Sequence, residues 1–191
     1  MAKVAVFIAD GSEEVEAITP VDLLRRAKVD VDVVSIMDSL EITASRNVKI
    51  TADKLIGDIS FDEYDLLVLP GGVKGTNNLN ACEVLKENLV KFNEQGKGIA
   101  AICAAICAAP TVFAGLGLLN GKDSTCNPGF WDELKSKGAN VIEDSKVVVN
   151  GNIITSQAMG TSVDFGLALV GYLLDAEVEE SLRKNIRFGA L

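Results

Sequence analysis

The chain has 191 residues, of which 48% are hydrophobic and 24% are charged. This composition is typical of a globular protein with a sizeable core, so neither a disordered chain nor a coiled coil is needed to account for it. The length suits a single domain over residues 1–191. Lys and Arg number 18 against 27 Asp and Glu, and the resulting net charge of −9 argues against nucleic acid as a partner.

The longest apolar stretches fall short of the ~20 residues that a membrane-spanning helix needs, so we expect no membrane segment. Residues 1–3 lead directly into an apolar, strand-like run and lack the pattern of a signal peptide. We therefore expect a cytoplasmic protein.

The chain contains no histidine, which excludes a Cys-His or Ser-His catalytic pair and a His-ligated metal site within it. Its cysteines are Cys82, Cys103, Cys107 and Cys126. Their spacing matches neither a zinc site nor a disulfide framework, so we expect reduced thiols, no metal and no cofactor.

Continuous apolar runs alternate with amphipathic stretches along the chain. The runs that predict buried strands are 4–9, 31–36, 66–69, 99–106 and 153–155. The stretches that predict helices are 12–28, 81–95, 110–119, 130–137 and 162–174, and the charged segment 177–184 is typical of a solvated helix face. This alternation predicts an α/β fold with a doubly wound, mostly parallel sheet and helices on both faces.

Two segments, 38–52 and 145–154, have shorter alternating runs than the predicted buried strands. The second segment contains Asn150-Gly151, a dipeptide that favours tight turns between antiparallel strands. We expect small antiparallel elements or a hairpin at the edge of the sheet.

In an open α/β sheet the ligand site lies beyond the carboxyl ends of the strands. Three of the predicted strand ends have unusual residues. The first leads into Ser12, a predicted helix N-cap, and then into an acidic group, Glu13, Glu14 and Glu16. The second leads into Pro70-Gly71-Gly72, and the third into Cys103 and Cys107.

A cysteine between a buried strand and a helix is stabilised as a thiolate by backbone N–H groups and the helix dipole, without a histidine. Glycines such as Gly71 and Gly72 let an anion approach the backbone. A carboxyl group that faces the cysteine can share a proton with it or bind an oxidised sulfur. Structural interpretations also stand: core packing for the cysteines, a turn for the glycines and a complement to the helix dipole for the glutamates.

These motifs, in order along nearly the whole chain, resemble those of the DJ-1 branch of the DJ-1/PfpI superfamily. The matching segments are 11–16 with 20–22, 69–72, 104–111, 154–156 and 160–162. The resemblance implies a flavodoxin-like fold, a homodimer and a reactive cysteine at a nucleophile elbow, paired with a glutamate that Glu16 matches. It also implies oxyanion-type donors from the backbone of Gly71, Gly72 and Ala108, while Arg26 and Arg46 match arginines near the dimer interface and the site.

Two departures from the family pattern affect the site. Asn127 stands where many members have a histidine, so a hydrolase that needs a Cys-His pair is not expected, and the protease-like and glyoxalase activities of the family are put in question. The sequence Ala-Ala-Ile-Cys also occurs twice, so counting from upstream makes Cys103 the elbow and counting back from Pro110 makes it Cys107. Because proline is accepted in the first helical turn but costs ~3 kcal/mol in a helix interior, Pro110 favours Cys107.

We expect a protein that protects against oxidative or reactive-carbonyl stress, in which the elbow cysteine is oxidised reversibly or attacks small reactive carbonyls. One alternative is a glyoxalase or deglycase with Cys107 as nucleophile and Glu16 as general acid/base. The other is a non-catalytic, chaperone-like dimer whose cysteine reports oxidation.

Overall fold

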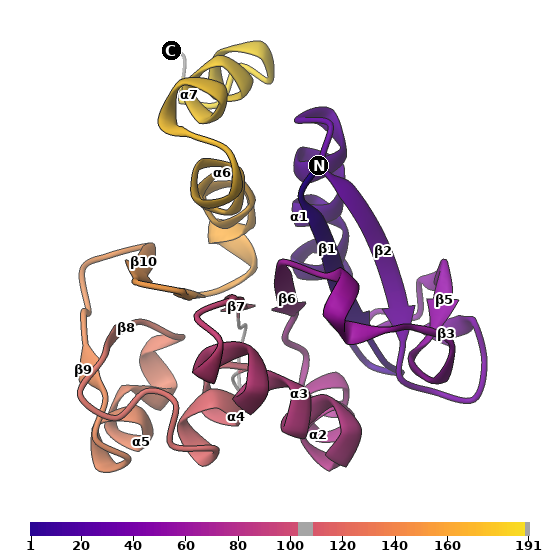
Figure 1. The fold of residues 1–191 in the computed structure, drawn as a ribbon. Coiled ribbons are helices and arrows are strands. Elements are labelled where there is room, and N and C mark those ends of the chain that lie inside the picture. The colour runs from indigo at the N-terminus through magenta and orange to yellow at the C-terminus, as the bar shows by residue number, and fades with distance from the viewer. Residues whose placement is uncertain (103–108, 190–191) are drawn as a thin grey trace.

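The computed structural model describes residues 1–102 and 109–189 (Figure 1). Its centre is a seven-stranded sheet with the strand order β10-β11-β7-β6-β1-β2-β5. All neighbours in this sheet are parallel except β10 and β11. The strands of the sheet are β1 (Lys3–Ile8), β2 (Asp30–Ser35), β5 (Lys54–Leu55), β6 (Leu66–Leu69), β7 (Gly98–Ile102), β10 (Val147–Asn150) and β11 (Ile153–Ser156). The predicted doubly wound, mostly parallel sheet is confirmed.

The apolar runs form the strands because both faces of the sheet are covered. Every residue of β6, β7 and β11 is buried, and β1 is buried from Val4 onward. On one face the core includes side chains of α2 (Val73–Ala81), α3 (Glu83–Glu94), α4 (Ala109–Gly115) and α5 (Trp131–Ser136). On the other it includes side chains of α1 (Glu14–Arg26), α6 (Ser162–Leu173) and α7 (Ala176–Asn185), which Figure 1 shows at the opposite end of the view from α2–α5.

Short elements connect these layers. Two antiparallel pairs confirm the prediction for 38–52 and 145–154: β3 (Glu41–Thr43) pairs with β4 (Lys49–Thr51), and β10 pairs with β11. A further short parallel pair joins β8 (Asp123–Ser124) to β9 (Asn140–Val141). The single-turn 3₁₀ helices are η1 (Ile56–Asp58), η2 (Phe61–Glu63), η3 (Pro128–Phe130) and η4 (Met159–Thr161).

Several predicted boundaries are wrong, for local reasons. The helix predicted from Ser12 begins at Glu14, because Glu13 caps it and Ser12 Oγ instead accepts a hydrogen bond from the Ala9 N–H (3.0 Å). Helix α2 was not expected as a separate element, since its polar sequence has no clear apolar period. The predicted strand 99–106 is described as far as Ile102, and its remaining residues lie outside the described part of the chain.

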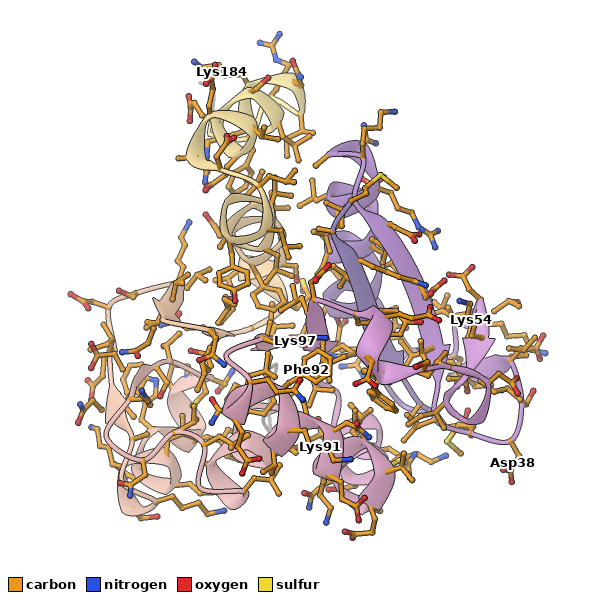
Figure 2. The ribbon with its side chains drawn as sticks, in the orientation of Figure 1. Asp38, Lys54, Lys91, Phe92, Lys97 and Lys184 are labelled. Carbon is orange, nitrogen blue, oxygen red and sulfur yellow. The ribbon has the colours of Figure 1, made fainter. Side chains whose placement is uncertain are left out.

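Polar contacts join β2 and β5 to the segments that lead into β6 and β7. The Tyr64 hydroxyl donates to Asp32 Oδ2 (2.7 Å), as does Lys54 Nζ (2.9 Å). Lys97 Nζ donates to the carbonyl of Tyr64 (2.8 Å) and lies 4.9 Å from the centre of the Phe92 ring; both residues are labelled in Figure 2. In the residues that the structure describes, no helix is both long and apolar enough to cross a bilayer.

Candidate functional site

The predicted site residues that lie together are at the carboxyl ends of β1 and β6. These strands are neighbours in the sheet, with Val4 opposite Leu66, so the loops that follow them leave from the same edge. The loop after β1 leads through Gly11 and Ser12 into α1, and the loop after β6 contains Gly71 and Gly72. Strand β7, which leads to the cysteine segment, lies directly beside β6.

Three hydrogen bonds close a ring between these two loops. The Glu13 N–H donates to the Gly71 carbonyl (2.9 Å), and the Gly71 N–H donates to Glu16 Oε2 (2.8 Å). The Glu16 N–H in turn donates to Glu13 Oε2 (2.8 Å), which makes Glu13 the N-cap of α1. The ring therefore fixes the position of the Glu16 carboxyl group from both its backbone and its side chain.

Glu16 is a buried acid with one unused oxygen. Its residue exposure is 0%, and Oε1 has no hydrogen-bond partner among the described residues. Burial raises the pKa of Glu16 to about 8; the Gly71 N–H opposes this shift and the Glu13 carboxylate adds to it. At neutral pH the carboxyl group is thus largely protonated, and Oε1–H is available as a donor to a ligand or a sulfur atom.

Close contact between the two loops requires glycine at position 72. Gly72 has φ +94°, and a Cβ there would lie 2.3 Å from the Gly11 carbonyl oxygen and 2.7 Å from the Glu13 nitrogen. The two predicted backbone donors have different surroundings: the Gly71 N–H is bonded to Glu16, whereas the Gly72 N–H has no acceptor among the described residues. Of the two predicted donors, only the Gly72 N–H is thus without a hydrogen-bond partner in the part of the chain that the structure describes.

The predicted nucleophiles Cys103 and Cys107, and the predicted donor Ala108, lie outside the described residues. The choice between the two cysteines stays a prediction, with Pro110 as the second residue of α4. Of the other cysteines, Cys82 is half-buried between α2 and α3. Cys126 is fully buried, and this burial together with the nearby Glu133 raises the pKa of its thiol to about 12, so it is not a thiolate at neutral pH.

Arg46 lies on the rim of a cavity of about 320 Å³. Its backbone N–H donates to Glu14 Oε1 (2.8 Å), and Ser45 Oγ donates to Glu14 Oε2 (2.7 Å), which holds the β3–β4 turn against the start of α1. The cavity is lined by Gly11, Thr43, Ala44, Ser45, Arg46, Asn47, Val73 and Lys74. It offers two cationic side chains beside the loop that contains Gly72.

Arg26 and Asn127 take no part in this ring of hydrogen bonds. Arg26 is ten residues beyond Glu16 on the same helix, a rise of about 15 Å, and pairs with Asp22 (2.7 Å) on an exposed surface. Asn127 caps η3, where its Oδ1 accepts from the Gly129 N–H (3.0 Å). At the position where many family members have a histidine, this chain thus has an asparagine whose side chain caps a local turn.

Sequence reasoning missed three buried hydroxyls. Thr76 Oγ1, Ser124 Oγ and Thr125 Oγ1 are buried without a hydrogen-bond partner among the described residues. The Thr125 N–H donates to Thr155 Oγ1 (2.9 Å), which links Ser124 and Thr125 to β11 beside the end of β7. Only the motif 154–156 pointed to this region. Within the same described residues, no group of three or more Cys, Asp and Glu is arranged to hold a metal ion.

Residues 2–171 match the sequence model of the DJ-1/PfpI family, and the chain belongs to this family. It is 42% identical over 169 residues to the protein DJ-1 homolog A of Arabidopsis thaliana, which covers 88% of this chain but only 41% of that protein. It is 30% identical to the glutathione-independent glyoxalase DJ-1 of Schizosaccharomyces pombe, with 97% and 98% of the two chains covered. The structure of oxidised Toxoplasma gondii DJ-1 superposes with a TM-score of 0.91 at 33% identity, over 99% and 100% of the chains.

Proposed function

We propose that this chain is a DJ-1-type protein that protects against reactive carbonyls and oxidants through an elbow cysteine, with Glu16 as its proton partner. The observation that supports this most is the buried Glu16 carboxyl at the sheet edge where the cysteine segment begins. Its pKa is raised to about 8, and its Oε1 has no hydrogen-bond partner among the described residues. A protonated carboxyl beside a thiol donates to the thiolate and, after oxidation, to a sulfinate oxygen. We assign the nucleophile to Cys107 and retain Cys103 as the alternative.

A glyoxalase activity is the second candidate, favoured by the similarity to the S. pombe glyoxalase. The thiolate adds to the aldehyde carbon of a small dicarbonyl, and the carbonyl oxygen takes the Glu16 proton, so that a hemithioacetal forms. Glu16, then a carboxylate, is placed to accept a proton in the next step. The Gly72 N–H supports the developing oxyanion, and Arg46 and Lys74 on the cavity rim favour polar substrates.

Turnover of methylglyoxal to lactate by the full chain separates these candidates. We expect Cys107→Ser to abolish turnover and Glu16→Gln to lower it by about 10²-fold or more, the range for loss of a general acid/base. Cys82→Ser, at a half-buried position between two helices, is the matched control and should leave turnover unchanged. Turnover that survives in Cys107→Ser and is lost in Cys103→Ser would move the nucleophile four residues upstream.

Oxidation under limiting peroxide tests the redox role. Peptide mapping should find oxygen first on Cys107, and the alkylation rate of this thiol should show an inflection well below the ordinary thiol pKa of ~8.5. A chain that neither turns over methylglyoxal nor has such an inflection would be a non-catalytic, chaperone-like protein. A cytoplasmic location stays part of this proposal.

A homodimer completes the proposal. The outer face of α1 exposes Val15 (41%) and Ile18 (40%), and the adjacent β3–β4 hairpin exposes Val48 (48%). Further along the same helix face, Asp22 and Arg26 border a second cavity of about 380 Å³. A self-complementary contact over α1 would bury these apolar side chains and explain why Arg26 matches an arginine at the family's dimer interface.

A further inference from the structure

The sequence contains the dipeptide Asn-Gly twice, at Asn120-Gly121 and at Asn150-Gly151. Asparagine before glycine is chemically labile because the backbone nitrogen of the next residue can attack the side-chain amide carbon, and glycine has no Cβ to obstruct that approach. The two dipeptides have the same local chemistry. Their surroundings in the fold differ at the atom that reacts.

At Asn150 the attacking nitrogen is free. Asn150 is the last residue of β10 and pairs with Ile153, so the turn consists of Gly151 and Asn152. The Gly151 N–H has no acceptor among the described residues. A Cβ placed on Gly151 or on Gly121 would meet nothing within 4 Å, so the difference between the two sites lies in the hydrogen bond and not in the open space. The nitrogen therefore lies in an open, solvent-exposed turn with no hydrogen bond to break before it reacts.

At Asn120 the corresponding nitrogen is held. The Gly121 N–H donates to the Gly138 carbonyl (2.8 Å). A Cβ on Gly138 would lie 2.5 Å from Asn120 Oδ1, so the Asn120 amide itself lies against the Gly138 backbone. Both reacting groups of this dipeptide are thus restrained by the same neighbouring residue.

The position of Asn150 in the sheet adds to the difference. Strand β10 stands at the end of the strand order and pairs with β11 alone among the described strands, so this hairpin lies at an edge of the sheet. Asn152, the second residue of the turn, is anchored, because its Nδ2 donates to the Lys97 carbonyl (2.9 Å) and to Asn93 Oδ1 (3.3 Å). Of the two turn residues, Asn152 is therefore held by these bonds, whereas the Gly151 N–H is not held by any acceptor among the described residues.

We propose that Asn150 is a site of spontaneous deamidation in the folded protein and that Asn120 is protected. The Gly151 nitrogen bonds to the side-chain carbon of Asn150, the carbon–nitrogen bond of the amide breaks, and ammonia leaves with the proton of the Gly151 N–H. Water then adds to either carbonyl of the cyclic imide and opens it, which leaves aspartate or isoaspartate at position 150.

The products alter the edge of the sheet. Either one adds a negative charge to a chain whose net charge is already −9. Isoaspartate also inserts one backbone methylene group into the turn that sets the register of β10 on β11. Strand β11 contains Thr155, which lies opposite Ala101 near the end of β7. A change in the register of β10 on β11 would therefore act on a strand that lies beside the candidate site.

The test is to incubate the folded, full-length chain at neutral to mildly alkaline pH and to map both peptides by mass spectrometry, with enzymatic carboxyl methylation to detect isoaspartate. We expect Asn150 to react at least roughly fivefold faster than Asn120, the factor that one net backbone hydrogen bond provides. In urea, where neither turn exists, the two rates should agree within about twofold, because the dipeptide alone then sets them.

The variant Asn150→Gln should remove the isoaspartate signal from the peptide that contains position 150. It should leave the slow reaction at Asn120 unchanged, which also shows that the variant is folded. Equal rates at the two sites in the folded chain, or a faster reaction at Asn120, would overturn the proposal. So would a folded chain that shows no reaction over a period in which the chain in urea reacts.

Discussion

At the residue scale, Glu16 is a buried acid whose raised pKa keeps its carboxyl group protonated near neutral pH. A carboxyl group with 0% exposure is unfavourable in its ionised form, and the single N–H of Gly71 does not compensate for the lost water. The raised pKa is the result, and it makes Glu16 a hydrogen-bond donor at neutral pH. Such displaced pKa values are frequent at sites that handle protons.

The first prediction concerns stability against pH. Because the folded-state pKa of Glu16 is about 8 and its ordinary value is 4.5, the folded chain binds more protons than the unfolded chain between these values. This group's contribution to the free energy of unfolding is therefore full below about pH 4.5 and falls as pH rises to about 8, by at most ~1.4 kcal/mol per pH unit. Urea denaturation across this range should show a smaller loss for Glu16→Gln than for the natural chain.

The matched control is Glu14→Gln, which changes a neighbouring acid whose pKa is lowered, because its hydrogen bonds from Ser45 and Arg46 outweigh its burial. This variant should retain the decline of stability above pH 4.5 that Glu16 produces. A difference between the natural chain and Glu16→Gln that is constant with pH would show that Glu16 is ionised in the folded state.

The second prediction concerns Glu13 as a positioning residue. Its charge adds to the raised pKa of Glu16, while its Oε2 accepts the Glu16 N–H. Glu13→Gln keeps an oxygen that can accept this hydrogen bond and removes the charge, so the pKa of Glu16 should fall towards its ordinary value. Carbon-13 NMR titration of labelled glutamate carboxyl groups measures this directly, without any reactive cysteine.

Asp175→Asn is the control for Glu13→Gln, because Asp175 caps α7 in the same way, with Oδ1 accepting from the Val178 N–H (2.8 Å). It neutralises an N-cap at another helix and should leave the Glu16 titration unchanged. An unchanged Glu16 pKa in Glu13→Gln, or an equal change in both variants, would refute the positioning role.

At the scale of the elements, the site depends on two strand-to-helix connections that touch each other. The segment from β1 to α1 and the segment from β6 to α2 approach so closely that Gly75 also has no room for a side chain: its Cβ would lie 2.6 Å from Ser12 backbone atoms. Backbone packed on backbone gives the Glu16 carboxyl a rigid support, which is what a positioned acid requires.

The third prediction follows from this contact. Gly72→Ala should destabilise the chain by at least ~2 kcal/mol, since alanine at φ +94° is strained and its Cβ would collide with the Gly11 carbonyl. It should also lower activity in the methylglyoxal or alkylation assay. Chemical denaturation measures the first effect.

Gly57→Ala is the comparison for this variant, because Gly57 has an ordinary φ and nothing within 4 Å of a Cβ. Its stability should change by no more than about 1 kcal/mol in either direction. Equal effects of the two substitutions would contradict the close approach of the two loops.

At the scale of the whole molecule, the proposed dimer places the exposed face of α1 between two copies of the chain. The fourth prediction is that Ile18→Glu shifts the chain to a monomer, because it would bury a charge in the contact without a partner. Sedimentation velocity measures the outcome. Val84→Glu introduces the same charge at an exposed apolar residue of α3 (53%) and should leave the oligomeric state unchanged. A natural chain that sediments as a monomer would rule out the contact.

The sequence by itself determined the class of fold and predicted that the candidate site lies at the carboxyl ends of the strands. Burial on both faces selects continuous apolar runs, and this local property placed β1, β2, β6 and β11 to within a residue or two. The positions of Glu16 and Gly71 after their strands followed from the same pattern. The family resemblance rested on these segments and is confirmed by the match over residues 2–171.

Only the tertiary structure decided how those residues are used. The bond from the Gly71 N–H to Glu16 joins residues 55 positions apart. No local pattern shows that this N–H is occupied while that of Gly72 has no acceptor among the described residues. Likewise, Ser12 is a local N-cap candidate that instead bonds back to Ala9, and Glu13 takes its place because its N–H binds Gly71. The same holds for the two Asn-Gly dipeptides, where only the fold shows that a distant carbonyl accepts the glycine N–H of one and not of the other. Hydrogen bonds between remote segments depend on how the strands are ordered in the sheet, and this order is a property of the whole fold.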